Sequence, residues 1–174
     1  MKILIAYDSK TGTAKDCAEL LAKQFSYHSV KLFDLREGSP NLSDFDFAIV
    51  GGSIRMGKFS KNMRSFIEKE KDSLLTLGHA FFICCCIPDE AEVYIRKNIP
   101  KELRESAVTA ENFGGELRPE RHRGIEKLFV KIARKSMMTN DEVNYPSEFK
   151  TLPAILPDTI SFFADKVRDS FAEK

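Results

Sequence analysis

The sequence contains no tryptophan, only three histidines, and no surplus of charge of one sign. Its 27 Lys and Arg residues balance 26 Asp and Glu residues, which leaves a net charge of +1. We therefore expect no nucleic-acid partner, because nucleic-acid-binding proteins concentrate positive charge. His28, His79 and His122 are far apart, and no Cys or carboxylate stands at metal-ligand spacing from them, so we expect no metal site.

Long hydrophobic runs are also missing. The longest, Ala80 to Ile87, has eight residues, far fewer than the roughly 18 needed to span a bilayer. The run from Ile3 to Tyr7 is too short for a secretory signal and ends at Asp8. We predict a cytoplasmic protein. Its 174 residues, 43% of them hydrophobic, are enough for one core, so we expect a single domain over residues 1–174.

Cysteines are few, and their spacing argues against a disulfide framework. Cys84, Cys85 and Cys86 are consecutive in one apolar segment, and Cys17 stands alone. Neighbouring residues of a strand point to opposite faces, so the three consecutive thiols are expected to be buried separately. Cys86, at the end of its segment, is the one that we consider for contact with a ligand or for redox sensitivity.

Strand-like and helix-like patterns alternate along the chain. Short apolar runs predict strands over residues 2–7, 30–35, 46–51, 79–87 and 107–113. Apolar stripes at helical spacing predict helices over residues 13–25, from Ser60 to about 74, over 89–104 with a break at Pro100, and over 157–172. This alternation predicts an α/β fold, a doubly wound five-stranded parallel sheet with helices on both faces.

Residues 114–149 do not fit this rhythm, because a short connection would be enough there, and we expect a late helical insertion. Between Glu116 and Met138 seven Lys and Arg residues face three Glu residues. A basic amphipathic helix over 118–138 can contact an anionic membrane at its inner face, a quinone-bearing complex or the carboxylates of a porphyrin. Alternatively, it packs on the domain with its cations in water.

The loop after the first predicted strand has the composition of a phosphate site. Residues 9–14 read Ser-Lys-Thr-Gly-Thr-Ala and run directly into a helix. Backbone N–H groups, three hydroxyls and the positive end of a helix then meet at one point. The spacing matches neither a P-loop nor the G-x-G-x-x-G fingerprint, which argues against ATP and NAD. The alternative is a loop that only caps the helix.

A second informative loop, Gly51 to Phe59, follows the third predicted strand. In an open sheet of order 2-1-3-4-5, the ends of strands one and three lie side by side at the switch point where ligands bind. The glycines allow close backbone approach, and Ile54 and Met56 can lie against a flat apolar ring. Arg55 can donate to a ring carbonyl or reach an acidic substrate. The alternatives are core packing for Met56 and a solvated tip for Arg55.

These two loops together resemble the flavodoxin family, whose members bind FMN. The second loop, Gly-Gly-Ser-Ile-Arg-Met-Gly-Lys-Phe, is similar to the Gly-x-Ser-Ile-Arg-x-Gly-x-Phe segment of the flavodoxin-like menaquinone-dependent protoporphyrinogen oxidases. His79-Ala-Phe-Phe82 and the late basic insertion also resemble that group. The similarity extends from Lys2 to about Val167.

The resemblance implies three groups of FMN-binding residues. It implies a phosphate site at Ser9, Lys10, Thr11, Gly12, Thr13 and Ala14. It implies contacts with the isoalloxazine ring from Ser53, Ile54, Arg55, Met56 and Gly57, and a third loop at Cys86, Ile87 and Pro88. Ala14 stands where flavodoxins usually have another hydroxyl, and Met56 stands where an aromatic ring is common. No catalytic residue beyond the flavin is expected.

The resemblance implies an FMN-dependent oxidoreductase that passes hydride from a porphyrinogen or related substrate to FMN and then to a quinone. The alternative is an electron-transfer flavodoxin that serves a redox partner and has no substrate of its own. Such carriers usually have a strongly acidic surface, which this chain lacks. A third reading, a domain whose glycine-rich loops bind nothing, predicts a colourless protein.

Overall fold

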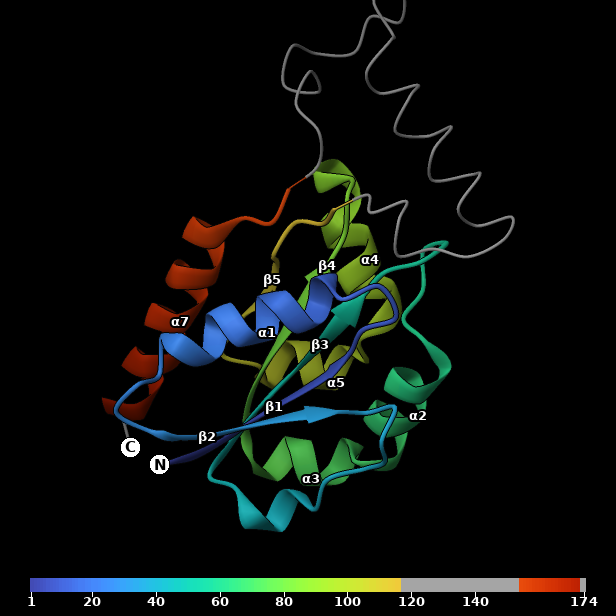
Figure 1. The fold of residues 1–174 in the computed structure, drawn as a ribbon. Helices are drawn as coiled ribbons and strands as arrows, with labels where there is room; N and C mark the ends of the chain where they lie inside the picture. The colour runs from blue at the N-terminus through green and yellow to red at the C-terminus, as the bar shows by residue number, and fades with distance from the viewer. Residues whose placement is uncertain (117–153, 173–174) are drawn as a thin grey trace, which may run out of the picture.

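We describe residues 1–116 and 154–172 of a computed structural model (Figure 1). They form a five-stranded sheet of order β2-β1-β3-β4-β5 in which all neighbouring strands are parallel. The strands are β1 (Lys2–Asp8), β2 (Ser29–Asp34), β3 (Phe47–Ser53), β4 (Gly78–Cys84) and β5 (Ala110–Asn112). The predicted doubly wound α/β fold and its strand order are confirmed.

Helices cover both faces of the sheet (Figure 1). The helices are α1 (Thr13–Lys23), α2 (Lys61–Lys69), α3 (Lys71–Thr76), α4 (Ala91–Asn98), α5 (Lys101–Ser106) and α7 (Pro157–Ala172). Helices α1 and α7 share one hydrophobic core with the sheet, and α2, α3 and α5 share the other. The alternation within β1 shows the division, because Ile3, Ile5 and Tyr7 join the first core and Leu4 and Ala6 the second.

Several elements end earlier than the sequence predicts. Strand β4 stops at Cys84 instead of Ile87, because the backbone N–H of Cys85 donates to the Asn112 side chain (3.0 Å) and leaves the strand ladder. The helix predicted from Ser60 to about residue 74 is two helices that meet at Glu70. The break predicted at Pro100 is present, between α4 and α5.

The described residues on either side of 117–153 are hydrogen-bonded to each other. The backbone N–H of Gly115 donates to the carbonyl of Ala154 (3.1 Å), and that of Leu156 donates to Phe113 (2.9 Å). The basic segment 118–138 lies outside the described residues, so its contact with a membrane or with the domain stays a prediction. Within residues 1–116 and 154–172, no helix is long and apolar enough to cross a membrane.

Candidate functional site

The loop between β1 and α1 presents buried hydroxyls that have no hydrogen-bond partner in the described structure. Ser9 and Thr13 are buried, and the oxygens Ser9 Oγ and Thr13 Oγ1 lack a partner. Gly12 precedes the helix in a left-handed conformation (φ 93°), and no side chain caps the first turn of α1. Buried hydroxyls normally find a partner, and the exposed N–H groups of a helix start attract anions. This combination fits a phosphate group.

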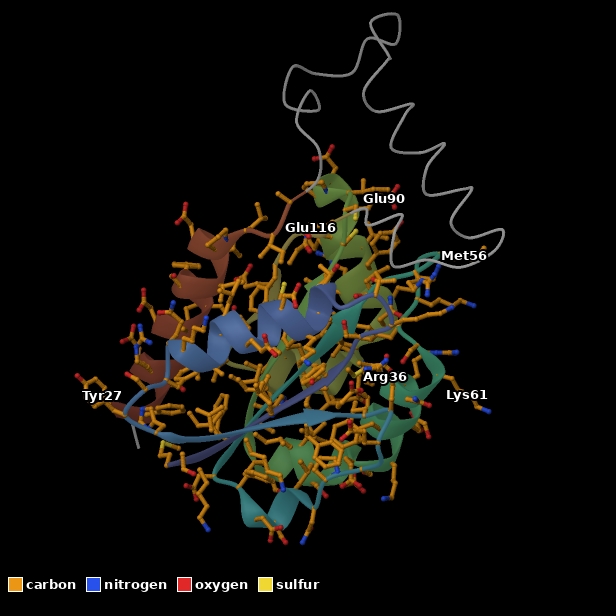
Figure 2. All side chains as sticks on the ribbon, in the orientation of Figure 1. Tyr27, Arg36, Met56, Lys61, Glu90 and Glu116 are labelled. Atoms are coloured by element: carbon orange, nitrogen blue, oxygen red, sulfur yellow. The ribbon has the colours of Figure 1, made fainter. Side chains whose placement is uncertain are left out.

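The segment after β3 is a tight hairpin. Arg55 and Lys58 exchange two backbone hydrogen bonds, of 2.9 and 3.1 Å. The two residues between them, Met56 (φ 50°) and Gly57 (φ 75°), both have positive φ, which is the geometry of a type I′ turn. Met56 is the only non-glycine residue with positive φ in residues 1–116 and 154–172, and its side chain projects fully exposed from the tip (Figure 2).

An asparagine of α4 holds this hairpin in place. Asn98 Oδ1 accepts from the backbone N–H of Phe59 (2.8 Å), and its Nδ2 donates to the carbonyls of Gly57 (3.1 Å) and Tyr94 (2.9 Å). One amide thus connects the tip of the turn and the residue that follows it to the helix. A loop fixed in this way loses less conformational freedom when it binds a ligand than a free loop does.

Both ends of the same loop are also anchored. At its start, the N–H of Ile54 donates to the carbonyl of Cys84 on β4 (2.9 Å). At its end, the Ser60 hydroxyl donates to the buried Asp8 carboxylate (2.7 Å) and accepts from the N–H of Met63 (3.1 Å). Ser60 therefore caps α2, as the sequence predicts, and ties this helix to β1.

The third hydroxyl without a partner belongs to the last residue of β3. Ser53 ends β3, pairs in register with Cys84 of β4, and its Oγ is buried with no hydrogen bond in the described residues. The neighbouring glycines serve packing. A Cβ on Gly51 would lie 2.3 Å from the carbonyl oxygen of Phe82, so only glycine fits beside that strand.

Asn112 organises the loop that follows β4. Its Oδ1 accepts from the backbone N–H groups of Cys85 (3.0 Å) and Gly114 (3.1 Å), and its Nδ2 donates to the carbonyl of Cys85 (3.3 Å). Gly115 packs closely here, since a Cβ on it would lie 2.8 Å from Cys86 Sγ. Two asparagines, Asn98 and Asn112, therefore each fix one loop at this edge.

The thiol of Cys86 in this loop is partly buried and favours its protonated form. Burial, with smaller effects of Cys85 and Glu116, raises the pKa of Cys86 to about 11. A thiol reacts through its thiolate, so at neutral pH Cys86 acts as a small, soft packing residue. All four cysteines, Cys17, Cys84, Cys85 and Cys86, are free thiols.

The three loops meet because they follow adjacent parallel strands. Asp8 of β1 pairs with Gly52 of β3, and Ser53 of β3 pairs with Cys84 of β4, so the three carboxyl ends lie at one edge of the sheet. Figure 1 shows the loop before α1, the hairpin after β3 and the start of α4 around this edge. The family model described as flavodoxin domain matches residues 4–144.

The chain belongs to the flavodoxin family. Among curated relatives, the protoporphyrinogen IX dehydrogenase [quinone] of Escherichia coli is 23% identical over 145 residues, which cover 78% of this chain and 80% of the relative. Two solved flavodoxins share the fold. The one from Streptococcus pneumoniae has 14% identity, a TM-score of 0.54, and coverage of 98% of this chain and 99% of its own. Flavodoxin 1 from Bacillus cereus has 13% identity, a TM-score of 0.52, and coverage of 97% and 98%.

In this member of the flavodoxin family, the residues predicted for the phosphate and the ring lie on the three converging loops, at the start of α1 or at the end of β3. Three of the phosphate residues, Ser9, Thr13 and Ala14, are buried, while Lys10 is exposed. Ile54 is half-buried and packs against the core under α2, whereas Ile87 and Pro88 are exposed. That Met56 contacts a flavin ring stays a prediction, since its side chain points into solvent.

Sequence reasoning did not identify Asn98, Asn112 or Asp8 as part of the site. Asn98 ends a helix and Asn112 ends a short strand, positions where asparagine is usually a solvated residue or a turn former. Their amides are recognised only when the partner loops are in place. The dipeptide Met-Gly between Arg55 and Lys58 is likewise a weak hairpin signal, because Asn-Gly and Asp-Gly are the usual ones.

Proposed function

We propose that the chain is a single FMN-binding domain over residues 1–174 and an oxidoreductase that oxidises protoporphyrinogen, or a related substrate, with a quinone as acceptor. The observation that carries the FMN proposal is the set of three buried hydroxyls without partners, Ser9 Oγ, Thr13 Oγ1 and Ser53 Oγ, at the edge where the three loops meet. Ser9 lies in the loop before α1, Thr13 is the first residue of that helix, and Ser53 is the last residue of the neighbouring strand β3.

The residues of the chain would divide the binding work. Ser9 and Thr13 would donate to the phosphate, and the uncapped first turn of α1 would add backbone N–H donors and its positive dipole. Ser53 would donate to the ring edge, and the anchored hairpin would exclude water from one side of the ring. Bound FMN supplies the capacity to accept a hydride or single electrons and to pass them on.

The substrate proposal is supported by the similarity to the protoporphyrinogen IX dehydrogenase, which covers about four fifths of both chains. Within the described residues, no group of three or more His, Cys, Asp or Glu could hold a metal ion. We therefore assign no step to a protein-bound metal in this part of the chain.

Anaerobic turnover tests the oxidase proposal. The FMN-loaded protein is mixed with protoporphyrinogen, and the flavin absorbance and the appearance of porphyrin fluorescence are followed before and after addition of a menaquinone. We expect loss of the flavin colour with substrate and its return with the quinone. A protein that holds FMN, is reduced by dithionite and does not respond to protoporphyrinogen would refute the substrate and favour the electron-carrier alternative.

The FMN-free chain serves as the control for this experiment. It measures the direct reaction between protoporphyrinogen and the quinone, because this background rate is the same with and without the cofactor. Parallel assays with each reactant omitted separate flavin reduction from flavin reoxidation. A rate that does not depend on bound FMN would contradict the proposal.

A further inference from the structure

The segment that runs from the end of β3 through the hairpin into α2 carries charge of one sign. No acidic residue occurs between Asp46 and Glu68, although the chain as a whole is nearly neutral. Four cations stand in this interval, and one more lies on α4. We call these residues the cationic rim: Arg55, Lys58, Lys61, Arg64 and Lys97.

Lys97 reaches the rim from a different element. Its Nζ lies 3.5 Å from the position that a Cβ on Gly57 would take, so its ammonium group is beside the tip of the hairpin. Lys58, Lys61, Arg64 and Lys97 are all exposed. Figure 2 shows Met56 and Lys61 on the same side of the molecule. One acidic group also lies near the hairpin tip, because the Tyr94 ring beside Gly57 donates its hydroxyl to the Glu90 carboxylate. The cations of the rim outnumber it.

Two of these cations lie where they do not stabilise helix α2. Lys61 is the first residue of α2, Arg64 lies in its first turn, and that turn contains no acidic residue. Cations at the positive end of a helix are unfavourable. Lys58, Lys61, Arg64 and Lys97 also form no ion pair with another residue of the described part of the chain. Their charges are therefore available to an external partner.

We propose that the cationic rim, together with the exposed Met56, is the docking surface for an acidic protein that exchanges electrons with the flavin. This inference rests on the proposed FMN site. An exposed methionine on a face that carries several cations is typical of a protein interface, where the apolar residue packs and the charges steer the approach. The rim spans the hairpin, the start of α2 and the end of α4, which is a wider face than a small anion needs.

With a one-electron acceptor, the electrons and protons of the exchange at this surface balance as follows. Two acceptor molecules each take one electron from reduced FMN, and the two protons that accompany this electron pair pass to water. The protein surface contributes the encounter and the orientation. The rate should therefore follow the charge of the acceptor and decrease with salt.

Binding to two haem proteins of opposite surface charge tests the proposal. Cytochrome b5 is acidic around its haem and cytochrome c is basic. The affinity of each for the wild-type chain is measured by biolayer interferometry at low and at physiological salt. The rim variant is Lys58→Glu/Lys61→Glu. The matched control, Lys23→Glu/Lys31→Glu, makes the same change of net charge at two exposed residues outside the rim.

We expect the wild type to bind cytochrome b5 more tightly than cytochrome c, with an affinity that falls about tenfold at physiological salt. The rim variant should lose about tenfold in affinity and in the rate of cytochrome b5 reduction, and the control variant should stay within about twofold. Thermal unfolding and FMN content verify that both variants fold.

Equal losses in the two variants, or a preference for cytochrome c, would overturn the proposal. So would a rim variant that keeps its affinity for cytochrome b5 but no longer sediments with phosphatidylglycerol vesicles, because the rim would then serve a lipid surface. Cytochrome binding needs no flavin in the assay. Failure of FMN binding would therefore refute the proposed function without being mistaken for failure of the rim.

Discussion

Replacing Thr13 by valine separates the stability of the chain from its affinity for FMN. Valine has nearly the shape of threonine and lacks the hydroxyl. In the protein without cofactor, Thr13 Oγ1 is buried and has no partner in the described residues. An unsatisfied buried polar group costs about 1–3 kcal/mol. We therefore expect Thr13→Val to raise the free energy of unfolding of the apoprotein by about 1 kcal/mol, which raises its Tm by roughly 2–4 °C.

The same substitution should weaken FMN binding. A hydrogen bond to a charged acceptor such as phosphate contributes about 1.5–3 kcal/mol. Its loss corresponds to an increase of the Kd of about 10- to 150-fold, at 1.4 kcal/mol for each factor of ten. Quenching of FMN fluorescence measures the Kd, and thermal or urea unfolding of the apoprotein measures the stability. The two quantities should thus change in opposite directions.

Thr76→Val is the matched control. Thr76 is exposed in α3, and its hydroxyl donates to the carbonyl of Ser73 (2.9 Å). This change should lower the stability slightly and leave the Kd for FMN unchanged. The reasoning about the phosphate site is wrong if Thr13→Val destabilises the apoprotein while the Kd for FMN stays at the wild-type value.

Three further predictions concern the loops. Asn98→Ala should raise the Kd for FMN and the Kd for riboflavin by the same factor, about tenfold, because it frees the hairpin and leaves the phosphate site intact. Asn98→Asp keeps the hydrogen-bond acceptor and should recover part of this loss of affinity. An increase of the Kd for FMN alone would contradict this role of Asn98. Met56→Gly should stabilise the chain by about 0.5–1 kcal/mol, since it removes a side chain from a left-handed backbone without loss of contacts; a lower Tm would be the opposite result. Iodoacetamide should alkylate Cys86 slowly at pH 7, because the raised pKa favours the unreactive thiol over the thiolate. The rate, followed by mass spectrometry, should increase about tenfold per pH unit up to about pH 11. A fast reaction at pH 7 would contradict that pKa.

The sequence was sufficient to predict the sheet, because each central strand is a short apolar run buried on both faces. The runs in β1 and β3 and the stripes in α1 and α7 follow from the period of burial alone, and they determine which strand ends are neighbours. The ends of the strands were harder to predict than their positions. Strand β4 continues as an apolar run to Ile87, and only the Asn112 side chain, 27 residues after Cys85, explains why the ladder ends at Cys84.

The sequence predicted which loops form the candidate site. Glycine and hydroxyl residues after two strands indicated where a ligand binds, and the topology brings these loops together. What holds the loops could not be predicted, because Asn98 acts over a sequence separation of 39 residues from Phe59 and Asp8 over 52 residues from Ser60. Such contacts depend on the folded arrangement of helices and have no local pattern.

The measurement that tests the central claim most directly is a titration of the purified apoprotein with FMN and with riboflavin, followed by flavin fluorescence and visible absorption. We predict saturation at one FMN per chain with a perturbed flavin spectrum, and a markedly weaker binding of riboflavin, which lacks the phosphate. Equal affinity for the two flavins would contradict the phosphate site at Ser9 and Thr13. The absence of any binding would contradict the account as a whole.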